Sequence, residues 1–300
     1  MTGFRLPAGP GEVQLQVASA SHAGMVRTVN EDSLLAEPPV FAVADGMGGH
    51  AFGDRASATA VLALHEEFDP EQATDAGHVL AAIRRANAAV RELTAWAGGG
   101  THLIAGTTLA GVALVVEHPE AAPRWMVFNL GDSRVYRWNG SGSPALERVS
   151  VDHSVVQELL DAGLIDEEGA RQHPERNVIT RALGAADEVR AEAWLLPATE
   201  PQTFLICSDG LTKELDDQQI AELLAPLDGA KGPGAEGPDA AVDRLLAAAL
   251  AAGGADNVSV VLVRAAYHGA VPNDSGVDEQ TRERGHSVLS PELDDTRPRA

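Results

Sequence analysis

The chain has 300 residues, a formal net charge of −22 and a hydrophobic content of 44%. This length supports one large domain or two small ones, and the acidic balance excludes a general nucleic-acid binder, because the chain would repel a phosphate backbone. A single cysteine, Cys207, excludes an intramolecular disulfide. No apolar run approaches the roughly 20 residues that span a bilayer, and no signal peptide is evident, so we expect a cytoplasmic protein without a membrane anchor.

The predicted organisation runs from a short leader through one domain to a tail. Residues 1–12 are rich in Gly and Pro and are interpreted as a flexible leader, and residues 13–266 as one folded domain. Residues 267–300 lack apolar periodicity and are interpreted as a disordered tail. Glycines crowd residues 228–237, which predicts a flexible surface loop.

Short apolar or β-branched runs predict strands at 40–44, 107–116, 125–130, 134–138, 203–207 and 257–264. Gly131-Asp132-Ser133 separates two of these runs, which suggests a hairpin. Apolar periodicity predicts helices that begin near Asp54, Asp75 and Asp239, and a short helical excursion at 154–162 and 166–172. Strands in hairpins and helices in pairs favour an α+β arrangement over a regular βαβ winding.

Three aspartates stand at the ends of predicted strands. Asp45 and Asp209 each follow a strand and precede a glycine, and Asp256 precedes the last strand. Carboxylates, together with a backbone carbonyl and water, suit magnesium or manganese. Asp-Gly is also a common turn dipeptide, so a single such pair is more often a turn than a metal site.

The sequence motifs around these aspartates are more specific than the aspartates alone. Six blocks follow one another: Gly24–Ser33, Val43–His50, Gly106–Leu109, Asn129–Arg134, Ile206–Leu211 and Asp256–Ser259. In this order, over about residues 13–265, they resemble the bacterial type 2C protein phosphatases, which are metal-dependent serine/threonine phosphatases. The resemblance implies an α-β-β-α sandwich of two antiparallel sheets flanked by helix pairs, with a small flap at about residues 153–180.

The resemblance also implies a reaction and a set of metal ligands. Phosphoserine or phosphothreonine on proteins would be hydrolysed by a water activated between two Mn²⁺ or Mg²⁺ ions, in opposition to Ser/Thr kinases. Asp45 matches the residue that bridges the ions, and Gly46 the residue whose carbonyl binds one of them. Asp209 and Asp256 match ligands of the other ion. Asp132, with Asp209, matches the ligands of a third ion, although Asp132 could equally cap its own turn.

Three further positions match residues that act around the metal ions. Glu31 and Asp32 match acids that bind metal-bound waters, and Arg27 matches the arginine that grips the substrate phosphate. From spacing alone, Arg27 could instead form a surface ion pair with Glu31. Met47 stands where many relatives carry a proton-donating histidine, so the general acid is not assigned.

Neither His50 nor His153 is assigned a catalytic role, because a lone histidine is more often structural. Cys207 lies in an apolar run and is interpreted as a buried small residue.

Rival enzyme classes fail on individual residues. A haloacid-dehalogenase-like phosphatase needs two aspartates one residue apart after a strand, whereas Gly46-Met47 follows Asp45. A P-loop enzyme needs a lysine in a glycine-rich phosphate loop, and neither lysine of the chain stands in one. A cysteine phosphatase needs a loop of backbone donors and an arginine around its cysteine, and Cys207 lacks both. The remaining alternative is a catalytically inactive module of the same family that binds metal or a partner. Nothing in the sequence demands more than a monomer.

Overall fold

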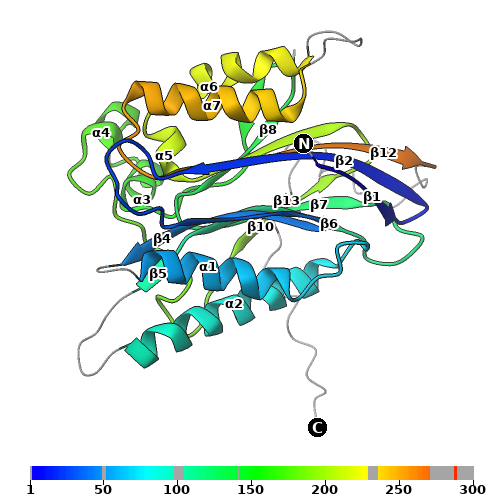
Figure 1. Cartoon of the computed structure of the whole chain (residues 1–300), viewed down its shortest axis with the longest axis horizontal. Coiled ribbons are helices and arrows are strands. Elements are labelled where there is room, and N and C mark those ends of the chain that lie inside the picture. The colour runs from blue at the N-terminus through cyan, green and yellow to red at the C-terminus, as the bar shows by residue number, and fades with distance from the viewer. Residues whose placement is uncertain are drawn as a thin grey trace.

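The computed structural model describes residues 2–48, 52–97, 105–140, 142–228, 236–270 and 287–288. The described strands form two antiparallel sheets that pack face to face, with helices on both outer faces (Figure 1). This is the α-β-β-α sandwich that the resemblance implied. None of the helices in these ranges is both long and apolar enough to cross a membrane.

The first sheet has the order β1-β2-β12-β11-β8-β9. Its strands are β1 (Thr2–Ala8), β2 (Gly11–His22), β12 (Val258–Gly269), β11 (Gln202–Cys207), β8 (Arg134–Trp138) and β9 (Leu146–Arg148). The second sheet has the order β13-β10-β7-β6-β4-β3, and β5 pairs with β4. Its strands are β13 (Ser287–Val288), β10 (Glu192–Pro197), β7 (Arg124–Leu130), β6 (Leu109–Val115), β4 (Val40–Gly48), β3 (Asp32–Glu37) and β5 (Ala105–Thr107).

Apolar residues at alternate strand positions fill the space between the sheets. Phe41, Trp125 and Phe204 are all fully buried there, and the Trp125 and Phe204 ring centroids lie 5.3 Å apart in an edge-to-face contact. Each sheet covers its other face with a helical layer. Helices α1 (Gly53–His65) and α2 (Ala76–Ala97) cover the second sheet, and α5 (Asp209–Thr212), α6 (Asp217–Leu224), the 3-10 helix η1 (Ala225–Asp228) and α7 (Pro238–Ala252) cover the first.

Local capping chemistry explains most helix starts. Asp75 accepts a hydrogen bond from the His78 backbone N–H (2.8 Å), as expected for the cap of α2. Asp239 does not cap α7, contrary to prediction: Gly237 takes that position and Pro238 begins the helix, because a proline at the first helical position loses no hydrogen bond. Gly253, with φ of 156°, ends α7 as predicted.

The predicted leader is wrong, because residues 2–12 belong to the first sheet. Leu6 and Ala8 of β1 alternate into the core and are each 1% exposed, and the strand pairs along its length with β2. At the other end, β12 continues to Gly269, past the predicted boundary at 266, and Ser287–Val288 pair with β10 inside the predicted tail. The other tail residues from 271 onward, and residues 229–235 of the predicted glycine-rich loop, lie outside the described residues.

The predicted hairpin around Gly131-Asp132-Ser133 is also wrong. β7 pairs with β6 and β10 in the second sheet, whereas β8 pairs with β11 and β9 in the first. Gly131, with φ of 102°, carries the chain from one sheet to the other, and a Cβ there would lie 2.6 Å from the Thr108 side chain. The crossing places Asp132 at the end of the sandwich, between the two layers.

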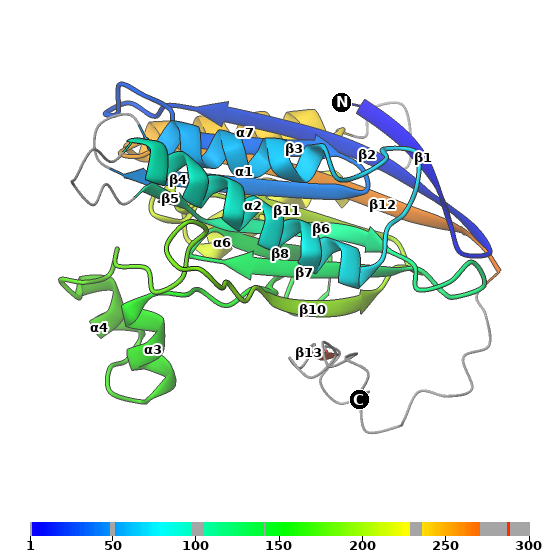
Figure 2. The ribbon, with the colours of Figure 1, turned by 90° about the horizontal axis from the view of Figure 1, so that it is seen from below.

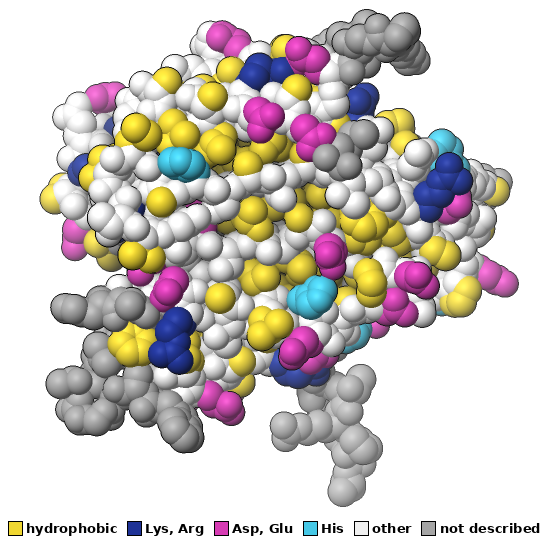
Figure 3. All heavy atoms as spheres, in the orientation of Figure 1, with side chains coloured by type: hydrophobic (Ala, Val, Ile, Leu, Met, Phe, Trp, Pro, Cys, Tyr) yellow, Lys and Arg dark blue, Asp and Glu magenta, His cyan; other side chains and the backbone are white. Residues whose placement is uncertain are grey.

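The flap stands to one side of the layers (Figure 2). It contains α3 (Val155–Asp161) and α4 (Glu167–Gln172), within the predicted helical excursion at 154–162 and 166–172, and the side chains of Ser154 and Asp166 cap them. No residue of α3 is buried, so the flap adds little to the core. On the face drawn in Figure 3, acidic side chains are scattered among neutral and hydrophobic ones, as expected for solvated surface charge.

Candidate active site

A cavity of about 340 Å³ opens at the end of the sandwich beside the flap. Seven of the eight predicted site residues line it: Arg27, Glu31, Asp45, Gly46, Asp132, Asp209 and Asp256. The eighth, Asp32, is buried next to it and is the register partner of Asp45 on the neighbouring strand. Residues that are far apart in the chain therefore meet at one end of the two sheets, beside the crossing and the start of α5.

Asp45 is held in the lining of the cavity by hydrogen bonds of its backbone. The prediction that Asp45 follows its strand is wrong, because β4 continues to Gly48 and pairs with β5 beyond it. The Asp45 N–H donates to Thr108 Oγ1, and the Asp45 carbonyl accepts from the Thr108 N–H, both at 2.9 Å. Removal from water, together with the charge of Asp209, raises the pKa of Asp45 well above its ordinary value.

Two glycines are required by close backbone contacts around the carboxylates. The Gly46 N–H donates to the Glu31 carbonyl at 3.1 Å, and a Cβ on Gly46 would lie 2.1 Å from the Gly53 carbonyl. A Cβ on Gly210, next to Asp209, would lie 1.9 Å from the Asn257 carbonyl. Any larger residue would push the surrounding loops apart, so these glycines keep the acidic segments close together.

Asp132 and Asp209 are acids in the cavity wall whose pKa values are raised. Removal from water, then repulsion by Asp209, raises the pKa of Asp132 to about 7, and removal from water raises the pKa of Asp209. Asp209 Oδ1 is buried without a hydrogen-bond partner, and so is Oδ1 of Asp32. Burial raises the pKa of Asp32 to about 6, although Ser208 donates a hydrogen bond of 2.8 Å to its other oxygen.

Asp256 is paired with two cations. Lys213 Nζ lies 2.9 Å from Asp256 Oδ2 and 2.5 Å from Asp209 Oδ2, and Arg27 lies 3.0 Å from Asp256 Oδ1. Burial raises the pKa of Asp256, but the hydrogen bond and charge of Lys213 outweigh it and lower the pKa overall. Arg27 therefore pairs with Asp256 and not with Glu31, the partner that spacing alone allowed.

Sequence reasoning assigned no role to Lys213, Thr108 or Asn257. The Asn257 side chain accepts from the Glu31 N–H at 2.8 Å and donates to the carbonyls of Ala23 and Val29, which fixes the loop that carries Arg27 and Glu31. Asn257 lies in a recognised block and could have been found there. Lys213, four residues after Asp209, has the spacing of any helical surface ion pair.

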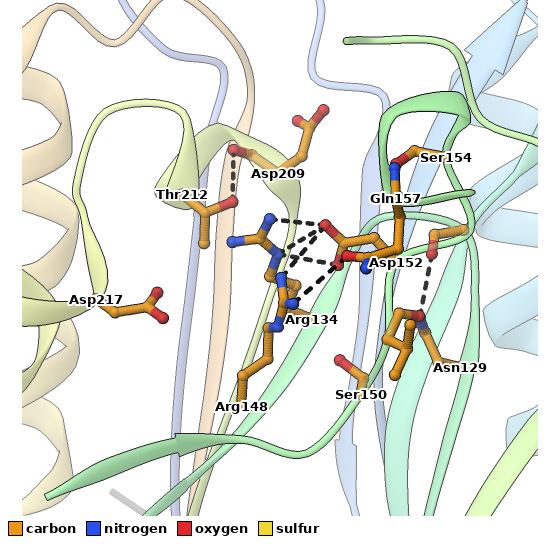
Figure 4. A network of polar contacts seen from close by, with 12 residues as sticks. Asn129, Arg134, Arg148, Ser150, Asp152, Ser154, Gln157, Asp209, Thr212 and Asp217 are labelled. Atoms are coloured by element: carbon orange, nitrogen blue, oxygen red, sulfur yellow. Dashed lines mark hydrogen bonds and ion pairs between the residues drawn. The ribbon is translucent and has the colours of Figure 1, made fainter. Parts of the chain in front are cut away.

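A buried ion pair joins the crossing to the base of the flap (Figure 4). Arg134 donates to both carboxylate oxygens of Asp152, at 2.6–3.1 Å, and to the Tyr136 hydroxyl. The next residue, His153, accepts from the Gly131 N–H through Nδ1 (3.1 Å), so its role here is to hold the loop of Asp132. Burial, together with the charge of Arg181, lowers the pKa of His153.

The remaining predictions about single residues have clear outcomes. Met47 lines the cavity, and His50 lies outside the described residues. Cys207 is fully buried and its pKa is raised to about 12 by burial, as expected for a structural thiol. A larger hollow of about 610 Å³ lies on the outer face of the first sheet, near Trp138 and Arg264, but no acidic cluster lines it.

The donor set of the cavity fits hard divalent cations. It consists of carboxylates and backbone, and Asp209 Oδ1 is a buried acceptor that no protein donor reaches. Among the described residues, no three His, Cys, Asp or Glu side chains lie close enough together to enclose one ion. Lys213 lies between two of the carboxylates, Asp209 and Asp256.

Comparisons with known proteins point to one family. The family model for protein phosphatase 2C matches residues 21–250. The serine/threonine protein phosphatase PstP of Mycobacterium tuberculosis is 35% identical over 249 residues, which cover 83% of this chain and 44% of PstP, so the chain spans less than half of that relative. The serine/threonine phosphatase stp of Listeria monocytogenes is 33% identical over 80% of this chain and 92% of its own.

A solved structure is similar over the same region. The catalytic domain of PstP in complex with two manganese ions is 32% identical, with a TM-score of 0.69, over 85% of this chain and 99% of that one.

Proposed function

The chain belongs to the protein phosphatase 2C family, and we propose that it hydrolyses phosphoserine and phosphothreonine on proteins with the help of two Mn²⁺ or Mg²⁺ ions. The observation that carries the proposal is the convergence of Asp45, Asp209 and Asp256 on one cavity, with Arg27 at its rim. The manganese-bound structure of PstP supports the choice of ion. The ions would lower the pKa of a water between them and offset charge on the phosphate.

We propose one role for each residue, following the family resemblance. Asp45, the Gly46 carbonyl, Asp209 and Asp256 would hold the two ions. Asp132 would hold a third ion together with Asp209, and Glu31 and Asp32 would orient water. Arg27, half exposed at the rim, can bind two phosphate oxygens and orient the group for in-line attack. Met47 cannot give a proton to the leaving group, so that proton would come from solvent in the cavity.

We propose phosphoproteins made by Ser/Thr kinases as the substrates, with the protein acting as a cytoplasmic monomer. The curated relatives named serine/threonine phosphatases support the substrate class. The flap residues Asn177 and Ile179 line the cavity, so the flap would contact any protein whose phosphorylated side chain enters it. The alternative, an inactive module that binds metal or a partner, differs in one respect: it would not turn over.

The test is hydrolysis by chelator-treated protein of p-nitrophenyl phosphate and a phosphothreonine peptide, with and without added Mn²⁺. We expect metal-dependent turnover that Asp209→Ala abolishes, because this change removes a ligand and a buried acceptor. Asp243→Ala, on the exposed face of α7, is the matched control and should leave turnover unchanged. If the folded wild-type protein binds Mn²⁺ without turnover, the inactive module is the correct interpretation.

A further inference from the structure

Lys213 occupies an unexpected position among the carboxylates of the cavity. The chain has only two lysines, Lys213 and Lys231. The Lys213 ammonium contacts Asp209 Oδ2 at 2.5 Å and Asp256 Oδ2 at 2.9 Å, so one positive charge bridges two of the residues proposed to hold an ion. A compact ammonium is a point charge that can take a place otherwise suited to a metal cation.

The fold holds Lys213 in this place. The Lys213 N–H donates to the Asp209 carbonyl at 2.8 Å, which puts the two side chains on one face of a helical turn. The neighbouring Glu214 accepts from the Ala255 N–H at 2.8 Å and ties α5 to the loop of Asp256. The two carboxylates are thus kept near each other by contacts that do not involve the Lys213 side chain.

The Lys213 side chain can also move away from the two carboxylates. Its side chain is 34% exposed, whereas those of Asp209 and Asp256 are 15% and 19% exposed, so the ammonium can swing toward solvent while the carboxylates stay. An ion held by both carboxylates would lie close to the ammonium, which contacts Oδ2 of each, and the two positive charges would repel each other. Lysine and ion therefore exclude each other, and the apparent affinity for the ion falls by the fraction of molecules in which the lysine has left.

We propose that Lys213 is an internal competitor of the cation at Asp209 and Asp256, and that it sets the metal concentration at which this second ion is bound. The inference rests on the proposed function, because it takes these residues as metal ligands. In metal-free protein, Lys213 offsets the repulsion between Asp209 and Asp256. When the ion binds, it neutralises the two carboxylates in place of Lys213, and the lysine side chain is released.

The first test is calorimetric titration of Mn²⁺ into the chelator-treated full-length chain, with Lys213→Met beside wild type. We expect the weaker of two binding events to become roughly tenfold tighter in the variant. The unfolding temperature of the metal-free variant should fall by about 2–4 °C, because the two carboxylates lose their counter-charge. Lys231→Met, which also removes one lysine charge, is the matched control and should change neither quantity.

The outcomes separate this inference from the function on which it rests. Unchanged or weaker Mn²⁺ affinity in Lys213→Met overturns the competitor role and leaves the proposed function standing. Failure of wild type to bind Mn²⁺ at all overturns the proposed function itself.

A second measurement detects the release of the lysine directly. Acetylation with acetic anhydride can be followed by peptide mass spectrometry, with Lys231 as the internal reference in the same chain. We expect Mn²⁺ to accelerate acetylation of Lys213 relative to Lys231, since the ammonium leaves its two carboxylates. An unchanged ratio across the Mn²⁺ titration would rule out displacement.

Discussion

Asp152 and the cavity carboxylates show two ways of removing an acid from water. Asp152 is 9% exposed and is met by Arg134 through both oxygens, with Arg148 nearby at 3.7 Å. Asp45, Asp132 and Asp209 instead face one another, and their pKa values are raised. In the first arrangement, arginine side chains of the same protein neutralise the charge of the acid. In the second arrangement the ionised acids repel one another and, among the described residues, only Lys213 offsets the charge of Asp209, so a bound divalent cation would stabilise the ionised forms further.

The largest effect on turnover is expected from Asp45→Asn. Turnover should fall by about a thousandfold or more, because a carboxylate proposed to hold the ions is lost. The metal-free protein should nevertheless resist urea at least as well as wild type, since one repelling charge is gone. Both quantities come from a phosphatase assay and an unfolding titration on the same sample. Lower stability of the metal-free variant would show that Asp45 supports the fold as well as the site.

Asp152→Ala should have the opposite effects: the metal-free protein loses stability, and turnover by the folded protein is largely kept. The Arg134 guanidinium, which is 23% exposed, would lose its carboxylate partner, at a cost of up to about 3–5 kcal/mol in the free energy of unfolding. Urea unfolding of metal-free protein measures this cost directly. Asp161→Ala, at an exposed position of the flap, should stay within about 0.5 kcal/mol of wild type. Equal losses in the two variants would contradict the contrast between paired and exposed acids.

The pH dependence of stability should sharpen the comparison further. The folded-state pKa values of Asp32 (about 6) and Asp132 (about 7) exceed the unfolded value of about 4. Between these values the folded state binds more protons than the unfolded state, so the stability of metal-free protein should fall as pH rises from about 4 to 7. Saturating Mn²⁺ should reverse the slope, because the ion binds ionised ligands. Thermal unfolding at several pH values, with and without Mn²⁺, tests both signs.

The smallest effect is expected at the edge of the paired network. The Tyr136 hydroxyl donates to Asp217 at 2.8 Å and accepts from Arg134 at 3.2 Å. Tyr136→Phe removes these bonds but keeps the buried ring, so about 1 kcal/mol of stability should be lost with little change in turnover. Differential scanning calorimetry beside a phosphatase assay measures both. A large loss of turnover would mean that this network reaches the cavity.

Local patterns in the sequence predicted what depends on near neighbours. The helix starts at Asp75, Ser154 and Asp166 follow from capping chemistry, and the buried Cys207 follows from its apolar strand. Local patterns failed where the partner is distant. Gly131 turns the chain as any hairpin glycine would, and only the pairing of β7 and β8 with different sheets shows that it carries a crossing.

The predicted site residues came from recognised motifs, and the structure brings them together around one cavity. The motifs do not identify the groups that neutralise or position the candidate metal ligands. A lysine four residues after an aspartate predicts an ordinary surface pair, and its contact with Asp256 depends on a loop 43 positions away. The Thr108 contacts of Asp45 likewise depend on how β4 meets the break between β5 and β6.

The pairing of β2 with β12 also governs when the protein can fold during its synthesis. Ser21 and Ser259 form a hydrogen bond of 2.7 Å across these strands, although 238 positions separate them in the chain. At ribosomal speeds of roughly 5–20 residues per second, β2 must wait on the order of ten seconds or more for its partner to emerge. Asp256 lies two residues before β12, while Arg27 follows β2. The candidate site, which needs Arg27 after β2 and Asp256 before β12, therefore cannot form until the ribosome has synthesised β12.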